Sequence, residues 1–140
     1  MASNGHSAHL TIEQQQQAIL QCCDDLLAVM RLNSSATDIG QVRMRLAGLL
    51  QANLAFEEAE VMGPLRQRPP AERPRNFTQM SEEAAGLRAR YSEHVRRWSL
   101  RQVDDDRAGY SAAAADLIRD VRKHLLKKQD LLPEWRRALQ

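Results

Sequence analysis

Apolar residues recur along this chain at alternating three- and four-residue steps, the spacing of the buried face of an amphipathic helix. In the first quarter of the chain, that face contains Ile12, Ile19, Cys23, Leu26 and Met30. Thr11 stands just before this face, and Gln14 follows it by three residues, which is the pattern of a capping box. The pattern therefore predicts a first helix that begins at Thr11.

A second helix is predicted after the turn sequence "NSSAT" at 33–37. It should end near Gly63 and Pro64, because glycine and proline interrupt helices. Its inward face would contain Ile39, Val42, Leu46, Leu49 and Leu50.

The second half of the chain predicts two more helices. The third runs from Thr78 or Ser81 to Trp98, and the fourth from Ser99, which opens a Ser-x-x-Gln cap, to about Asp130. Inward positions of the third are Met80, Ala84, Leu87, Tyr91, His94 and Trp98. Inward positions of the fourth are Tyr110, Ala114, Leu117, Val121, His124, Lys128 and Leu131. Pro133 suits the first turn of a short last helix.

Four amphipathic helices with short first and third connections predict an all-α, up-down-up-down four-helix bundle over residues 11–140, with a short extra C-terminal helix. Between its halves, residues 66–77 contain three prolines and four arginines. We expect this segment to be an exposed, extended loop, with a grip on an anionic partner as the alternative. The small and polar residues 1–10, with His6 and His9, predict a flexible tail.

Composition narrows the class of protein. The chain has 140 residues, of which 43% are hydrophobic and 4% aromatic, and this balance favours one helical domain. Its net charge of +2 is mixed along the chain, so we expect neither nucleic acid nor a membrane as partner. No long apolar run or secretory signal stands out, which predicts a cytoplasmic protein. The adjacent Cys22 and Cys23 predict no disulfide.

Several polar residues stand at seam positions, the helix positions that face the bundle axis and are usually apolar. An unpaired polar group there costs a few kcal/mol. Counted along the helices from the proline breaks and the first turn, six residues should share one level: Gln16, Asn53, Glu57, Glu83, His124 and Lys128. His94 should lie apart, because the 11 residues that separate it from Glu83 span about 16 Å of helix. We expect His94 to be hydrogen-bonded near Tyr91 and Trp98.

Four segments of the chain together resemble the hemerythrin-like (HHE cation-binding) family: "QAILQCCDDLL", "NLAFEEAEVMGPL", "SEEAAGLRARYSEH" and "HLLKKQDLLPEW". The resemblance covers most of residues 11–135, and the second and fourth segments are its most specific parts. It implies a four-helix bundle around a di-iron site made of inward histidines and carboxylates.

The resemblance also implies that most of this site has changed. Two of the six ligand positions keep a ligand of the family type, Glu57 and His124. Gln16 and Asn53 stand where histidines would, and Glu83 stands at or near a third histidine position. Lys128 replaces a carboxylate, and its ammonium group repels a cation and offers only hydrogen-bond donors.

Our first hypothesis is a non-catalytic interaction or regulatory module without a metal cofactor, in which the six residues form a hydrogen-bonded polar network. Lys128 would then supply positive charge in place of iron, or else extend to solvent past the end of the bundle. The alternative is a mononuclear iron or zinc site held by Glu57, Glu83 and His124. No arrangement of catalytic residues predicts an enzyme.

The sequence identifies no protein partner, and it leaves a homodimer open. Four apolar residues near the ends of the second and last helices would form the dimer surface or cover the bundle's own end: Val61, Met62, Leu132 and Trp135, with Leu139 beside them.

Overall fold

The structure, a computed structural model, describes residues 10–140, and within that range every regular element is helical. Four helices have 20 residues or more: α2 (Ile12–Arg31), α3 (Ala36–Glu57), α5 (Phe77–Arg97) and α7 (Arg107–Ala138). The all-α prediction is therefore confirmed for this part of the chain. The predicted flexible tail, including His6 and His9, lies outside the described residues apart from Leu10. No helix within residues 10–140 is long and apolar enough to cross a membrane.

The helix starts follow the local signals in the sequence. Thr11 and Gln14 form the predicted capping box, with the Thr11 hydroxyl accepting from Gln14 N at 3.0 Å and the Gln14 side chain accepting from Thr11 N at 2.9 Å. Ser35 caps α3 by accepting from Asp38 N. These caps satisfy backbone donors that the first helical turn leaves free, so they depend on only a few neighbouring residues.

The predicted end of the second helix at Gly63 and Pro64 is wrong. The chain continues through a π-helical turn, η1 (Glu58–Met62), into the short helix α4 (Gly63–Arg66). Pro64 lies in the first turn of α4, where a missing N–H costs little. The wider π-helical turn therefore carries the chain past a residue that would disrupt a continuous α-helix.

The predicted fourth helix is divided at a different place. A six-residue helix, α6 (Leu100–Asp105), follows the Ser99 cap, and the chain then turns at Asp106. The Asp106 carboxylate caps α7 by accepting from Gly109 N at 2.9 Å. A Cβ atom at position 109 would come within 2.2 Å of that carboxylate, so any other residue there would require the Asp106 side chain to shift.

The prediction of a separate short C-terminal helix is also wrong, because α7 runs without a break through Pro133. Neighbouring side chains anchor the helix on both sides of the proline: Leu132 and Trp135 are almost fully buried. Trp135 packs its ring 6.1 Å from that of Phe77. Tertiary packing here outweighs the local cost of the missing hydrogen bond.

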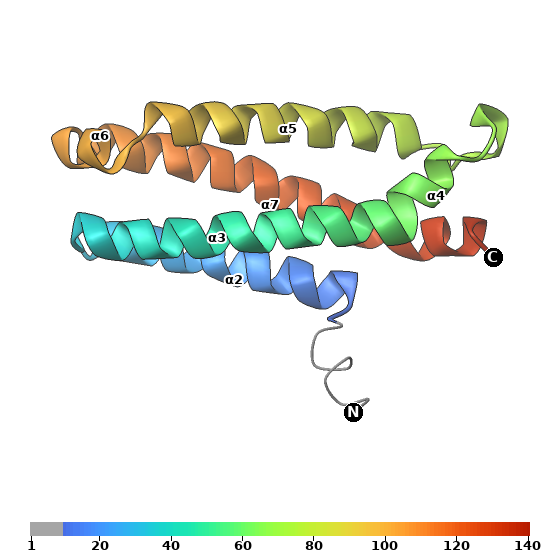
Figure 1. The fold of residues 1–140 in the computed structure, drawn as a ribbon, viewed down its shortest axis with the longest axis horizontal. Helices are drawn as coiled ribbons and strands as arrows, with labels where there is room; N and C mark the ends of the chain where they lie inside the picture. The colour runs from blue at the N-terminus through green and yellow to red at the C-terminus, as the bar shows by residue number, and fades with distance from the viewer. Residues whose placement is uncertain (1–9) are drawn as a thin grey trace.

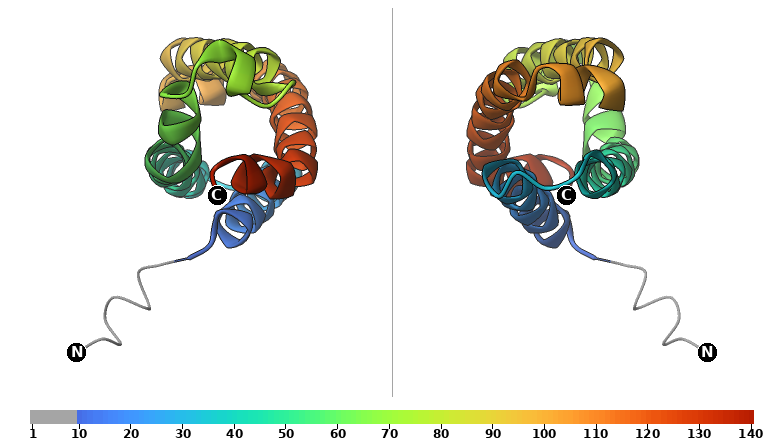
Figure 2. Two further views of the ribbon diagram at one scale, coloured as in Figure 1. Left: turned by 90° about the vertical axis from the view of Figure 1, so that its right-hand side faces the viewer. Right: turned by 90° about the vertical axis from the view of Figure 1, so that its left-hand side faces the viewer.

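The four long helices lie along one axis and alternate in direction, as Figure 1 shows. The hairpin of α2 and α3 is the closest pairing, and α7 packs against both α2 and α5. No comparable backbone packing joins α3 to α5. Views along the axis show the helices arranged around a common centre (Figure 2).

Apolar side chains fill this centre in two clusters. The larger one lies towards the α2–α3 turn and contains Ile19, Leu26, Leu46 and Tyr110, among others. The smaller one lies at the opposite end and contains Ile12, Val61, Leu65, Phe77, Met80, Leu132 and Trp135. Val61, Leu132 and Trp135 therefore cover the protein's own end, and they are not exposed as a dimer surface.

The arginine-rich loop at 66–77 is less extended than predicted. It contains the 3₁₀ turn η2 (Pro70–Glu72), and the Arg73 guanidinium donates to the backbone oxygens of Arg66 and Arg68 at 2.8 and 3.0 Å. Arg66 also forms an ion pair with Glu58. Two of the four arginines therefore hold the loop in shape.

Candidate functional site: a polar layer inside the helices

A buried carboxylate, Glu57 at the end of α3, joins three of the long helices. Its Oε1 accepts from Lys128 Nζ of α7 at 2.8 Å, and its Oε2 accepts from Gln16 Nε2 of α2 at 3.2 Å. The three residues are 3%, 8% and 0% exposed, in the order Glu57, Lys128 and Gln16. Lys128 therefore does not extend to solvent, and its charge is paired inside the protein.

The fourth long helix joins through Glu83 of α5. Its Oε1 lies 2.7 Å from Nδ1 of His124, and its Oε2 accepts from Lys127 Nζ at 3.0 Å. His124 is buried one turn before Lys128 on α7, whereas Glu83 and Lys127 lie nearer the surface. We call Gln16, Glu57, Glu83, His124 and Lys128 the polar layer.

Two of the other polar seam residues lie outside these bonds. Asn53 is buried, but its Nδ2 donates to Gln15 Oε1 at 2.8 Å and not to a member of the polar layer. His94 lies apart, as expected, with its ring stacked on Tyr110 at a centroid distance of 5.6 Å. Among the described residues, the His94 side chain makes this ring stack and not the expected hydrogen bond.

The charges of the polar layer balance once Lys127, the surface partner of Glu83, is included. Burial lowers the pKa of His124 below its ordinary value, against the opposing effect of its hydrogen bond to Glu83, and the nearby Lys128 ammonium lowers it further. The hydrogen bond from His124, followed by that from Lys127, holds the pKa of Glu83 below its usual range. Near pH 7 the imidazole is therefore neutral, and two carboxylates face the two ammonium groups of Lys127 and Lys128.

This protonation state determines the tautomer of His124. Glu83 is ionised and only accepts, so the proton of the neutral imidazole lies on Nδ1 and Nε2 carries a lone pair. Nε2 is buried, and no donor among residues 10–140 reaches it. Gln16 Oε1 is in the same situation. The two buried atoms of the layer without a partner are thus both acceptors.

The proposed mononuclear metal site does not match this geometry. Within the described part of the chain, no three His, Cys, Asp or Glu side chains are close enough to hold a metal ion. Glu83 approaches His124 from the Nδ1 side, so the two cannot place a carboxylate oxygen and Nε2 on one ion. Both oxygens of Glu57 are already hydrogen-bonded, one of them to an ammonium group. The residues present do not fit iron or zinc.

Two participants were missed by the sequence reasoning, Gln15 and Lys127. Each directly neighbours a predicted member, Gln16 or Lys128, but stands at a helix position that the inward seam does not include. Long, flexible side chains reach across from such flanking positions, and the seam pattern does not register them.

Comparisons with protein-family models, curated proteins and solved structures find no match for this chain.

Proposed function

We propose that this protein is a hemerythrin-like, up-down-up-down four-helix bundle in which an ion-paired polar network occupies the place of the di-iron site. On this proposal it is a cytoplasmic, non-catalytic module that acts through interaction or regulation. The sequence segments that resemble the family support it, and so does the alternating direction of the four long helices.

One observation carries the proposal. The Lys128 ammonium lies 2.8 Å from Glu57 Oε1, and both residues stand at positions where the resemblance to the family implies a metal ligand. A cation bound there would be repelled by this ammonium and would have to displace it from its carboxylate. The polar layer thus provides internally the positive charge that a metal ion would otherwise supply.

Metal content is the direct test. The full chain, purified without a histidine tag, is mixed with Fe(II) or Zn(II), desalted and examined by elemental analysis. We expect well under one metal ion per chain. Retention of one ion per chain, abolished by His124→Ala, would refute the proposal.

A charge reversal gives a matched pair of variants. Lys128→Glu replaces the repelling ammonium with a further carboxylate beside His124 and Glu57, so metal retention should rise. Arg101→Glu makes the same change of charge on an exposed side chain outside the polar layer. It should leave metal retention as in the unmodified chain.

A further inference from the structure

Exposed apolar side chains gather on the surface between α3 and α5. Seven large apolar side chains are exposed among residues 10–140, and four of them belong to α3, α5 or the start of α6: Met44, Leu54, Val95 and Leu100. Met44 is the most exposed of these four, at 77%. Single exposed apolar residues are common, whereas a group of them on one face indicates an interaction surface.

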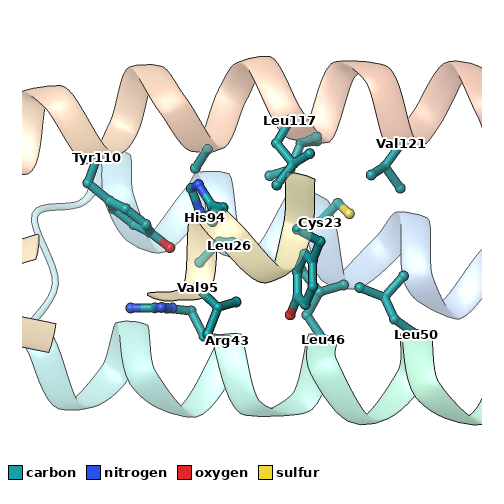
Figure 3. A pocket seen from close by; sticks show the side chains of 13 residues that line it. Cys23, Leu26, Arg43, Leu46, Leu50, His94, Val95, Tyr110, Leu117 and Val121 are labelled. Atoms are coloured by element: carbon teal, nitrogen blue, oxygen red, sulfur yellow. The ribbon is translucent and has the colours of Figure 1, made fainter. Parts of the chain in front are cut away.

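These side chains follow one edge of the molecule. Leu100 packs over Gly40 near the start of α3, since a Cβ atom at position 40 would lie 3.2 Å from its Cδ1. Farther along, Val95 of α5 lines the same small pocket as Leu50 of α3 (Figure 3). Leu54 follows Leu50 by one helical turn. The edge from position 40 to position 54 is about 21 Å long.

This edge is open along its length. The helices α3 and α5 lack close backbone packing, and both carry small residues here: Ala47 one turn after Arg43, and Ser92 one turn after Arg88. The enclosed space beneath is about 30 Å³, room for about one water molecule, so a partner would lie on the edge and not inside the protein. We call the surface formed by the following side chains the furrow: Met44, Leu50, Leu54, Val95 and Leu100.

Two arginines without an acidic partner border the furrow, one towards each end. Arg43 lines the small pocket beside Val95. Arg88 stands seven residues before Val95, on the same face of α5. The hydrogen bond from Arg66 lowers the pKa of Glu58, and the charges of Arg66 and Arg88 lower it further, which places Arg88 near the end of α3. No ion pair within residues 10–140 involves Arg43 or Arg88.

We propose that the furrow binds an amphipathic helix with acidic flanks, presented by another protein. The apolar face of that helix packs on the furrow, as in other helix-in-groove complexes, and its carboxylates pair with Arg43 and Arg88. A helix of about 14 residues has the length of the furrow. This inference rests on the proposed function, because it names the partner of the interaction module, but it uses no residue of the polar layer.

The charges distinguish this partner from two others. A second copy of the chain would place its own Arg43 and Arg88 against the same two residues, and the furrow contains no carboxylate to pair with them. An anionic membrane surface attracts clusters of about four to eight basic residues, and two arginines fall short of that number. An acid-flanked helix matches both the apolar strip and the two separate charges.

A synthetic peptide is the probe. It is capped at both ends, has about 16 residues, and carries leucine along one helical face with glutamate on either side. Amide chemical shifts of the full chain are followed by NMR as the peptide is added at pH 7.5. We expect saturable shifts confined to segments 40–54 and 88–100, with a Kd below about 0.2 mM. The same peptide with lysine in place of glutamate should bind at least about tenfold more weakly.

Variants test the charges and the apolar strip separately. Arg43→Gln and Arg88→Gln should each weaken binding of the acidic peptide about threefold to tenfold. Arg137→Gln is their control, since it removes the same charge from an exposed position near the far end of α7. Val95→Ser should weaken binding about threefold, whereas Leu126→Ser, on a similarly exposed apolar residue of α7, should leave the Kd unchanged. Circular dichroism confirms that each variant is folded.

Three results would overturn the proposal: no saturable shifts with about 1 mM acidic peptide, equal affinity for the acidic and the lysine peptide, or an unchanged Kd in both folded arginine variants. Two others would overturn it by identifying a different occupant. Binding to phosphatidylglycerol vesicles that Arg43→Gln weakens would indicate a membrane surface. A dimer in sedimentation equilibrium that Val95→Ser dissociates would indicate a second copy. None of these results changes the metal content expected of the polar layer, so the two proposals can fail separately.

Discussion

Buried polar groups are paired in the polar layer, but not in the small pocket between α3 and α5 that Arg43, His94 and Tyr110 help to line (Figure 3). In the polar layer, Glu57 and Lys128 neutralise each other within 2.8 Å, and Gln16 occupies the remaining carboxylate oxygen. In the pocket, Arg43 has no acidic partner and the Tyr110 hydroxyl has no hydrogen-bond partner within the part of the chain that the structure describes.

This difference separates two roles for buried polarity. A buried charge that is paired within the chain holds the helices in one arrangement. A ligand gains little free energy by contacting such a charge, because the charge already has its partner. A buried donor without a partner costs free energy in the empty state, and a ligand that pairs with it recovers that cost. The Tyr110 hydroxyl therefore has more to gain from a small polar partner, such as a water molecule, than the paired groups of the polar layer have.

Breaking the buried ion pair should have the largest effect on stability. Lys128→Met leaves the Glu57 carboxylate buried without its ammonium partner, and we expect the free energy of unfolding to fall by about 3–5 kcal/mol. Urea denaturation followed by circular dichroism at pH 7 measures this. Lys127→Met, on an exposed side chain, should cost less than about 1 kcal/mol.

The double variant Glu57→Met/Lys128→Met tests whether the loss comes from the unpaired charge. Two apolar side chains of similar volume should recover most of the stability that the single variant loses. A single variant within about 1 kcal/mol of the unmodified chain would contradict the description of the polar layer as charge-matched.

Removing the unpaired hydroxyl from the pocket should have a smaller effect, and in the opposite direction. Tyr110→Phe keeps the ring that stacks on His94 but deletes a buried group without a partner. We expect the free energy of unfolding to stay the same or to rise by up to about 1 kcal/mol. Gln16→Met, which deletes a donor to Glu57, should instead lower it by about 1–2 kcal/mol. A clear loss of stability in Tyr110→Phe would show that its hydroxyl is satisfied in solution.

The smallest expected effect is on pH dependence, and here the two regions should agree. Burial lowers the pKa of both His124 and His94 below the ordinary 6.5, so the unfolded chain binds protons that the folded protein does not. The free energy of unfolding should therefore fall as the pH drops below about 6.5. Glu83 contributes in a separate window, because its lowered pKa affects stability only as the pH falls below its unfolded value of 4.5.

Urea denaturation at pH 7.5 and 5.5 measures the histidine contribution. His124→Gln and His94→Gln should each reduce the loss of stability between these two pH values. An unchanged pH dependence in both variants would show that neither imidazole stays neutral on acidification.

The sequence by itself determined the local parts of this protein. The capping box at Thr11, the serine caps and the three-and-four spacing predicted where most of the long helices lie, because these signals act between residues only a few positions apart. The same spacing gave the levels along the helices, and it brought together Gln16, Glu57 and Lys128 as well as Glu83 and His124.

Only the tertiary structure decided the remaining features. Pro133 does not end α7, because contacts with distant side chains outweigh the local cost of the proline. Pro64 lies in the first turn of α4, after a π-helical turn that the sequence pattern does not predict. Asn53 donates to Gln15 and not to Gln16. These two glutamines are adjacent on α2, and adjacent residues of a helix point in different directions. The pocket depends on how far apart α3 and α5 lie, and distances between helices follow from packing across the whole interior.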